Sequence, residues 1–470
     1  MNGTRENSET QEHQRLASRL VAFAGGPPAD PPSVSDVLAG AQASSAGSAS
    51  SPQAGSGQAG ARLAVTDWAV IPVERGSAEK WKAAIEVQWE AGQEKERYEV
   101  WLQRRMELEE WHFESRRLPE AERAAALATP WAIGAGTELG RNPLTGFHRL
   151  ARVVSALAPG SPACLDLSSC VVHSGAWLRE VAACDVPPHP RNLFSIHTVY
   201  DQNDPGGPMW LHTHGLLRCG SVEFEFIDAP RQAVGLIVEL METVCIGAID
   251  HGTEPPRTPF SPGDGIEMEW IPWPEAGRYM PGRLGTRQRD RDDYHRLPSG
   301  VLVERRGSWP FRRYVSPRRA LVVMSRNPVL YVSDIETRRM ERLATARFDL
   351  FRRAFEKFRG REGWSFFIKL GYPVDGADSP EDKEHLWFEC SELDETRAFG
   401  KLVNDPVHVA GLTKGQAGWH DLSRMTDWHV QSPKYRYDPD NITTMPEETF
   451  AKGEEQGDSR ELSPSGESLA

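Results

Sequence analysis

Several short stretches in the middle of the chain alternate apolar and polar residues or are rich in β-branched residues, a pattern typical of strands. These stretches are residues 163–167, 193–200, 209–214, 221–227, 266–270 and 300–304. Residues 201–208 are rich in Asp, Asn, Gly and Pro and predict the turn of a β-hairpin. Apolar residues at helical spacing over 176–183 and 233–248 add two helices. The pattern predicts an α+β fold, with a central, mostly antiparallel sheet domain over residues 130–335.

Residues 77–127 carry a stripe of aromatic and aliphatic residues that predicts a Trp-rich helical segment. Trp81, Ile85 and Trp89 lie four residues apart, and Gly92 is a candidate break between two helices. The stripe continues with Tyr98, Trp101, Leu108 and Trp111. We expect this segment to pack on the neighbouring domain, with an external docking surface as the alternative.

The helical spacing of apolar residues over 337–358 predicts a helix that opens a second, smaller α+β domain over residues 338–432. Strands are expected in it at 364–370, 385–391 and 399–403. Residues 1–62 are mostly small residues and proline, and residues 438–470 are acidic and polar. Neither end offers enough apolar surface to offset the entropy of ordering, so we expect a disordered leader and a disordered tail.

The composition narrows the class of protein. With 54 Lys and Arg against 67 Asp and Glu, the formal net charge is -13, which disfavours nucleic acid as a partner. No window approaches the ~20 apolar residues of a membrane span. The 6 cysteines form no CxxC pair, as expected of free thiols in a reducing compartment. We therefore expect a cytoplasmic protein whose partner is another protein.

The densest candidate chemistry lies in residues 210–220, which read Trp-Leu-His-Thr-His-Gly-Leu-Leu-Arg-Cys-Gly. In a strand, His212 and His214 point to the same face. Such a pair suits either a metal site or a hydrogen-bonded structural pair. Trp210 and Arg218 are candidate recognition residues beside it. Cys219 fits a small buried residue better than a nucleophile.

The register of the predicted hairpin decides what these histidines can do. If residue 200 pairs with residue 209, His197 lies opposite His212, and Ser195 lies opposite His214. Three imidazoles would then share one face, and three His ligands with one open position form a catalytic zinc arrangement. A slip of one residue would send His197 to the other face and leave a structural role for the pair.

Glu223 and Glu225 follow on the next predicted strand. Their strict alternation with Val222, Phe224 and Phe226 predicts that both carboxylates lie on the solvated face of a half-buried strand. The alternative is that they orient the imidazoles or act as a base.

The second domain offers a weaker candidate. Glu384-His385 and Asp427-Trp428 could together form a small polar site. Trp387 and Trp428 are expected to be core or rim aromatics. They would form a recognition patch if both were exposed on one face.

The motifs of residues 340–432 resemble those of the YegJ-like family of uncharacterised bacterial modules. The resemblance lies in Phe-Phe-Ile-Lys at 366–369, Glu-His-Leu-Trp-Phe at 384–388, Gly-Lys-Leu-Val-Asn-Asp-Pro at 400–406 and Asp-Trp at 427–428. Lys414-Gly415-Gln416 departs from it, because the family usually has Gly followed by an acidic residue there. Residues 160–335 resemble a second uncharacterised bacterial family through Ser-Gly-Ala-Trp-Leu at 174–178, Ser-Ile-His at 195–197, the histidine motif and Trp-Ile-Pro-Trp at 270–273. Neither resemblance implies a reaction.

Two hypotheses of function follow. The first is a cytosolic binding protein without a catalytic set, for which an immunity or stress-accessory role rests on analogy alone. The alternative is a metal-dependent hydrolase that uses His212, His214 and His197, with zinc as its cofactor. The sequence has no GxGxxG, no GxxxxGK[ST] and no GxSxG motif, so nucleotide binding and a serine nucleophile elbow have no support.

Overall fold

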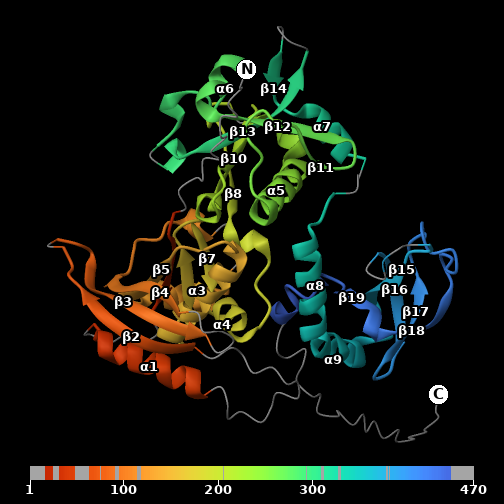
Figure 1. Ribbon diagram of the computed structural model, residues 1–470, viewed down its shortest axis with the longest axis horizontal. Helices are drawn as coiled ribbons and strands as arrows, with labels where there is room; N and C mark the ends of the chain where they lie inside the picture. Colours follow the sequence, from red (N-terminus) through yellow and green to blue (C-terminus); the bar gives the residue numbers. More distant parts are fainter. Residues whose placement is uncertain are drawn as a thin grey trace, which may run out of the picture. The chain divides into compact units, whose positions relative to one another are not determined.

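The structure, a computed structural model, describes residues 16–24, 31–47, 63–74, 76–89, 95–113, 118–204, 206–292, 294–307, 312–326, 330–376, 379 and 382–445. The chain divides into two compact units, Met1–Thr337 and Arg338–Ala470. Helices pack on sheets in both units, and almost all of the described strand pairs are antiparallel (Figure 1). The predicted α+β class is therefore confirmed.

The first sheet of unit 1 has seven strands in the order β2-β3-β4-β5-β1-β6-β7. Their bounds are β1 (Ser18–Phe23), β2 (Leu63–Ile71), β3 (Glu79–Trp89), β4 (Lys95–Arg104), β5 (Trp131–Thr137), β6 (Ala163–Asp166) and β7 (Val171–Ser174). One face packs against α1 (Val34–Gly47), α3 (Pro143–Leu157) and α4 (Gly175–Ala183) (Figure 1). The opposite face packs against α2 (Glu120–Ala128).

The expected disordered leader is wrong for residues 18–23 and 34–47. β1 lies inside the first sheet, between β5 and β6, and its residues Leu20 to Phe23 are at most 1% exposed. Both faces of this strand are covered, so an unbroken apolar run suits it better than alternation. The rest of the expected leader lies outside the described residues, except for residues 16, 17, 24 and 31–33.

The prediction of helix for residues 77–127 is wrong for most of the segment, which forms β3 and β4. Trp81, Ile85 and Trp89 are four residues apart, which is an even number. Residues an even number apart also lie on the same face of a strand. The intervening Ala83 and Val87 are buried too, so the true period is two. Among the described residues of this segment, helix appears near its end, in the 3-10 turn η1 (Glu110–Phe113) and in α2.

The second sheet of unit 1 follows the order β11-β12-β13-β10-β9-β8. Its strands are β8 (Ser195–Val199), β9 (Met209–His214), β10 (Glu223–Ala229), β11 (Phe260–Gly263), β12 (Ile266–Pro272) and β13 (Ser299–Arg306), and β14 (Arg313–Val315) pairs with β13. Only β10 and β13 pair in parallel among the described strands. The core on one face includes α5 (Val234–His251) and α7 (Arg318–Met324), and the core on the other includes α6 (Trp273–Tyr279).

One described helical stretch, Arg231–His251, is long and apolar enough to cross a membrane, judged by length and composition alone. It contains α5, whose seven buried residues run from Ile237 to Ile249. These residues join the hydrophobic core of unit 1, and α5 contacts β10, β11 and α7. Packing in the core therefore accounts for the apolar character of these seven residues, while 39% of the apolar window is buried.

Unit 2 is a six-stranded sheet in the order β18-β17-β16-β15-β19-β20, covered on one face by helices. Its strands are β15 (Ser365–Pro373), β16 (Lys383–Leu393), β17 (Arg397–Leu402), β18 (Ala417–Asp421), β19 (Met425–Gln431) and β20 (Arg436–Tyr437). The helix predicted over 337–358 is two helices, α8 (Asp334–Ala346) and α9 (Phe348–Phe358). Ile442 and Met445 join the core, so the expected tail is wrong there, and residues 446–470 lie outside the described residues.

Short 3-10 helices connect several of these elements. In the described part of the chain, besides η1, they are η2 (Pro190–Leu193), η3 (Leu216–Cys219), η4 (Arg231–Ala233), η5 (Gln288–Asp290), η6 (Tyr294–Arg296), η7 (Leu422–Arg424) and η8 (Ile442–Thr444). Two of them, η3 and η6, flank the candidate site of unit 1.

Candidate metal centre

The β8–β9 hairpin brings three histidines together on one face of the second sheet. His197 pairs with His212, and Ser195 pairs with His214, so the structure has the first of the two registers that the sequence left open. One imidazole nitrogen from each of His197, His212 and His214 lies within 4.8 Å of the other two. Tetrahedral coordination of zinc with bonds near 2.0 Å needs ligand nitrogens about 3.3 Å apart, so the three side chains would have to move closer together to hold the ion.

A fourth imidazole, which the sequence analysis missed, joins them from η6. The His295 Nε2 atom lies 2.9 Å from the Nε2 atom of His212. The Nδ1 atom of His295 lies 2.7 Å from the Oδ1 atom of Asp292. An Nδ1–H that donates to this carboxylate fixes the tautomer of His295, so its Nε2 atom accepts the hydrogen bond from Nε2–H of His212.

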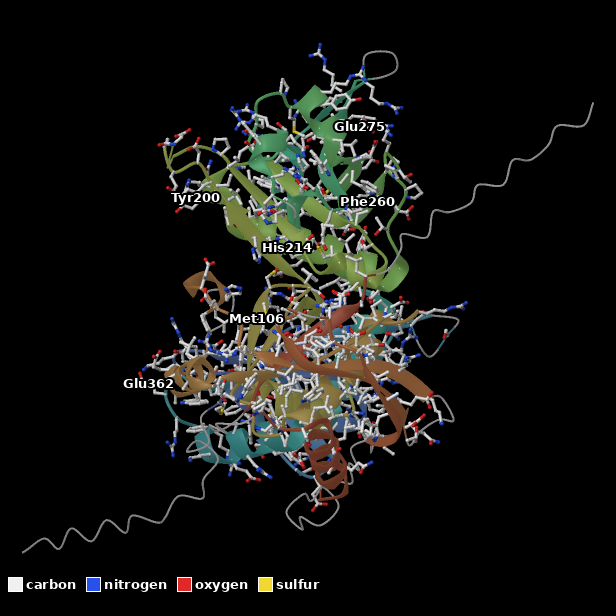
Figure 2. All side chains as sticks on the ribbon, turned by 90° about the vertical axis from the view of Figure 1, so that its left-hand side faces the viewer. Met106, Tyr200, His214, Phe260, Glu275 and Glu362 are labelled. Carbon is white, nitrogen blue, oxygen red and sulfur yellow. The ribbon has the colours of Figure 1, made fainter. Side chains whose placement is uncertain are left out.

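The histidines line a cavity of about 420 Å³. Its other walls include the apolar side chains of Met106, Leu165, Leu167 and Val199. Figure 2 shows Met106 and His214 on facing sides of the junction between the two sheets of unit 1. No Lys or Arg lines the cavity among the described residues. The cavity therefore suits a small ligand without a large negative charge.

Burial lowers the pKa of the imidazoles of His197, His212 and His214 and keeps them neutral. Desolvation, followed by repulsion from the neighbouring imidazoles, lowers the pKa of His214 to about 3. The same two causes lower the pKa of His212 well below its ordinary value, and desolvation and His295 lower that of His197. Neutral imidazole is the form that binds a metal. The cluster is therefore ready to bind a metal at neutral pH.

His212 also carries a polar atom that the fold leaves unsatisfied. Its side chain is 3% exposed, and its Nδ1 atom has no hydrogen-bond partner among the described residues. Buried polar atoms nearly always have partners, so an orphan here indicates a missing ion or water. The grouped imidazoles, the lowered pKa values of His197, His212 and His214, and this unsatisfied Nδ1 atom together fit a transition-metal ion.

The prediction that Glu223 and Glu225 form a solvated face is wrong, because both are buried. Glu225 pairs with Arg291 and accepts hydrogen bonds from Trp210 Nε1 and Ser299 Oγ. Arg291 comes from the long loop after α6, which has no sequence pattern that ties it to β10.

Glu223 fixes the turn that follows His214. Its Oε2 atom accepts a 2.6 Å hydrogen bond from Thr213 Oγ1, and its Oε1 atom accepts bonds from the backbone N–H groups of Gly215 and Leu217. Burial raises the pKa of this carboxyl, while these hydrogen bonds lower it. Among the described residues, neither Glu223 nor Glu225 has a hydrogen bond to an imidazole. Glu223 holds the backbone after His214, and Glu225 holds Arg291, which donates to the carbonyl oxygen of His295.

Gly215 allows the close approach that turns the chain after the histidines. Its φ is 115°, and a Cβ atom there would lie 2.3 Å from the carbonyl oxygen of Leu193. The backbone can therefore pass directly from the histidine strand into η3 only with glycine at this position.

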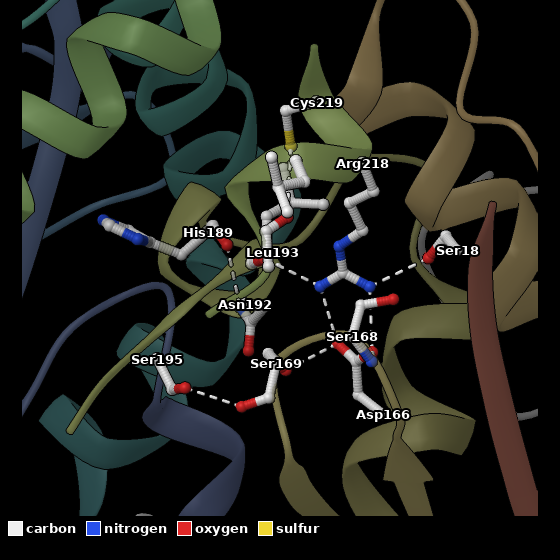
Figure 3. Close-up of polar contacts among 12 residues, drawn as sticks. Ser18, Asp166, Ser168, Ser169, His189, Asn192, Leu193, Ser195, Arg218 and Cys219 are labelled. Atoms are coloured by element: carbon white, nitrogen blue, oxygen red, sulfur yellow. Dashed lines mark hydrogen bonds and ion pairs between the residues drawn. The ribbon is translucent and has the colours of Figure 1, made fainter. Parts of the chain in front are cut away.

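Arg218, predicted to be a recognition residue, is instead a buried structural residue with 1% exposure. It forms a bidentate pair with Asp166 of β6, with distances of 2.9 and 2.6 Å. It also donates to Ser18 Oγ of β1 and to the carbonyl oxygen of Leu193 (Figure 3). Arg218 thus ties the segment after the histidines to the first sheet. Trp210 is likewise 1% exposed and cannot serve as a recognition surface.

The polar site predicted in unit 2 is only partly formed. His385, Trp387 and Asp427 lie on the sheet face opposite the helices, because Gly371 pairs with His385 and Lys369 pairs with both Trp387 and Asp427. Desolvation raises the pKa of Asp427 to about 6 and lowers that of His385.

Trp428 lies on the other face of that sheet. It is fully buried, and its Nε1–H donates to the carbonyl oxygen of Ala344. A recognition patch made of Trp387 and Trp428 together is therefore excluded. Trp387 contacts His429 and Lys369 instead.

The fold and the site define a two-unit α+β protein with a histidine-lined cavity in its first unit. Residues 64–188 match the N-terminal part, and residues 196–303 the C-terminal part, of a protein of unknown function, DUF4026. Residues 338–457 match DUF2314, an uncharacterised protein conserved in bacteria. Matches to both parts of DUF4026 are thus followed along the chain by a match to DUF2314, which is consistent with the expected uncharacterised bacterial multi-domain protein. Comparison with curated proteins and with solved structures gave no match.

Proposed function

We propose that unit 1 is a zinc-dependent hydrolase whose metal is held by His197, His212 and His214. One observation carries this proposal: three neutral imidazoles place their nitrogens within 4.8 Å of one another in the wall of a cavity of about 420 Å³. Three histidines with an open fourth position form the ligand set of catalytic rather than structural zinc sites. When bound, the metal would lower the pKa of a coordinated water to about 7.

His295 is the residue placed to handle the proton of such a reaction. Its Nε2 atom faces the cluster, and Asp292 orients the ring. A histidine held in this way can accept a proton from water and return it to a leaving group. The apolar walls and the lack of Lys or Arg among the described lining residues favour an uncharged substrate, such as a small ester or amide.

Cobalt substitution tests whether the site has an open coordination position. We expect Co²⁺-loaded full-length protein to show visible absorption bands that change when azide is added. His212→Ala should abolish the bands, whereas His251→Ala, at the exposed end of α5, should keep them. We also expect the zinc-loaded protein to hydrolyse p-nitrophenyl acetate, and His212→Ala to lose this activity. Bands that azide leaves unchanged would indicate a closed structural site and contradict hydrolysis.

A cytoplasmic location and a protein partner remain predictions from composition. The proposal of a protein-binding role applies best to unit 2, whose sheet face opposite the helices presents half-buried Phe367, Trp387 and His429 in contact. Aromatic residues of this kind are enriched at protein interfaces. Loss of the bound partner on Trp387→Ala, in a protein that keeps its stability, would support that role.

A further inference from the structure

A second cavity of unit 1, of about 400 Å³, is lined by three arginines. Arg283 follows α6, Arg306 ends β13, and Arg318 begins α7. Figure 1 shows α6, β13 and β14 gathered at one end of unit 1. Asp228 is the one acidic residue in the lining, so the described walls carry a net charge of +2 (three arginines minus one aspartate). This concentration of positive charge stands out in a chain of net charge -13.

Asp228 holds two of these guanidinium groups in place. Its Oδ2 atom accepts a 2.8 Å hydrogen bond from Arg318, and its Oδ1 atom lies 3.3 Å from Nε of Arg283. Arginine has five N–H donors, so each guanidinium keeps donors for another acceptor. Nε of Arg306 faces Glu304 at 3.3 Å, which likewise leaves its terminal nitrogens available. The three side chains are about half exposed, so they can reach a ligand in the cavity.

Ser316 gives an independent indication of a missing ligand. It lines the same cavity, its residue is 7% exposed, and its Oγ atom has no hydrogen-bond partner in the described part of the chain. A buried hydroxyl without a partner costs stability, so its presence needs an explanation. A ligand oxygen in the cavity would satisfy it.

We propose that this cavity binds an organic oxyanion, a phosphate or carboxylate group attached to an apolar body. Arginine forks and a hydroxyl are the donors that recognise such groups. Tyr279 and Met280 line the cavity beside the arginines and provide apolar surface for the rest of the molecule. None of the residues that line this cavity lines the histidine cavity, so the two sites are separate.

Calorimetric titration of the full-length protein tests this site with phenyl phosphate, benzoate and inorganic phosphate as probes. We expect phenyl phosphate to bind about tenfold more tightly than inorganic phosphate, because the ring buries apolar surface. Binding should weaken as salt is added, since the guanidinium groups are partly exposed. Benzoate binding with equal or greater affinity would identify the ligand as a carboxylate, and weaker binding would identify it as a phosphate.

Two variants and a matched control locate the binding. Arg318→Gln and Ser316→Ala should each weaken the preferred probe about tenfold, since each removes a hydrogen bond to a charged group. Ser316→Ala should leave the melting temperature of ligand-free protein unchanged or higher, because its hydroxyl has no partner to lose. Arg319→Gln, next in the sequence but outside the cavity lining, should bind as the parent does.

Several results would overturn the proposal. These are the absence of binding by both organic probes, equal affinity for phenyl and inorganic phosphate, and equal weakening in Arg319→Gln. Zinc content should be the same in all three variants, because the two cavities are separate. A failure of the oxyanion proposal would therefore not affect the zinc proposal, and a failure of the zinc proposal would not affect the oxyanion proposal.

Discussion

Arg218→Met is expected to destabilise unit 1 by about 3–5 kcal/mol, the range for removing one partner of a buried ion pair. Arg218 and Asp166 are 1% and 0% exposed, so the substitution leaves a carboxylate in an apolar interior. It also removes the hydrogen bonds to Ser18 and Leu193 and the contact of the guanidinium with the ring of Phe147. Urea denaturation of the full-length protein measures the loss.

Two further variants separate the ion pair from general damage. Arg218→Met combined with Asp166→Asn should be more stable than Arg218→Met alone, because asparagine carries no charge but still accepts from the backbone N–H of Ser168. Arg191→Met removes an arginine that is 55% exposed from its pair with Glu242, which is 18% exposed, so it should cost clearly less than Arg218→Met, about 1 kcal/mol. If Arg218→Met cost as little as Arg191→Met, Arg218 would not hold the two sheets together.

The second large effect is a loss of stability in acid by the metal-free protein. Burial lowers the pKa of His214 from 6.5 to about 3 in the folded state. Between these values the unfolded chain takes up a proton that the folded chain does not. Stability is therefore retained above pH 6.5 and lost as the pH falls toward 3, by about 1.4 kcal/mol per pH unit for each such histidine. His212, whose pKa is also far below 6.5, adds to the effect.

Denaturation curves at a series of pH values, with a chelator present, measure this slope. His214→Gln cannot take up the proton in either state, so it should lose less stability between pH 7 and pH 5 than the parent. His251→Gln, an exposed histidine at the end of α5, should keep the slope of the parent. A parent protein whose stability did not fall in this window would show that the imidazoles are solvated in the folded state.

The hairpin could be predicted from the sequence because its turn and its alternation act locally. The residues between Tyr200 and Met209 are turn formers, and fixing that turn sets the pairing of His197 with His212. Parity within one strand then places His212 and His214 on the same face. The local pattern does not choose between this register and a slip of one residue, so the sequence alone leaves the position of His197 open.

The partners of the histidines could not be predicted, because they come from distant and irregular segments. His295 and Asp292 lie in a charged loop with no periodicity, about 80 residues after His212. The burial of Glu225 depends on Arg291 from the same loop. Alternation correctly indicated a strand there, but it cannot distinguish a solvated polar face from one covered by a distant cation.

The error over residues 77–127 has a different physical cause. Residues spaced by four satisfy both a helix of 3.6 residues per turn and a strand of period two. The buried Ala83 and Val87 would have distinguished them, but alanine and valine between large aromatics are weak signals. Likewise, β1 owes its place to pairing with β5, more than 100 residues later, which no local pattern reveals.

The account depends most on a zinc ion bound by His197, His212 and His214. Equilibrium dialysis of the purified full-length protein against zinc, followed by elemental analysis, tests this most directly. We predict one zinc per chain in the parent and in His251→Ala, and none at this site in a folded His212→Ala/His214→Ala double variant. A parent protein that stays free of zinc, or a double variant that binds as much as the parent, would contradict the account.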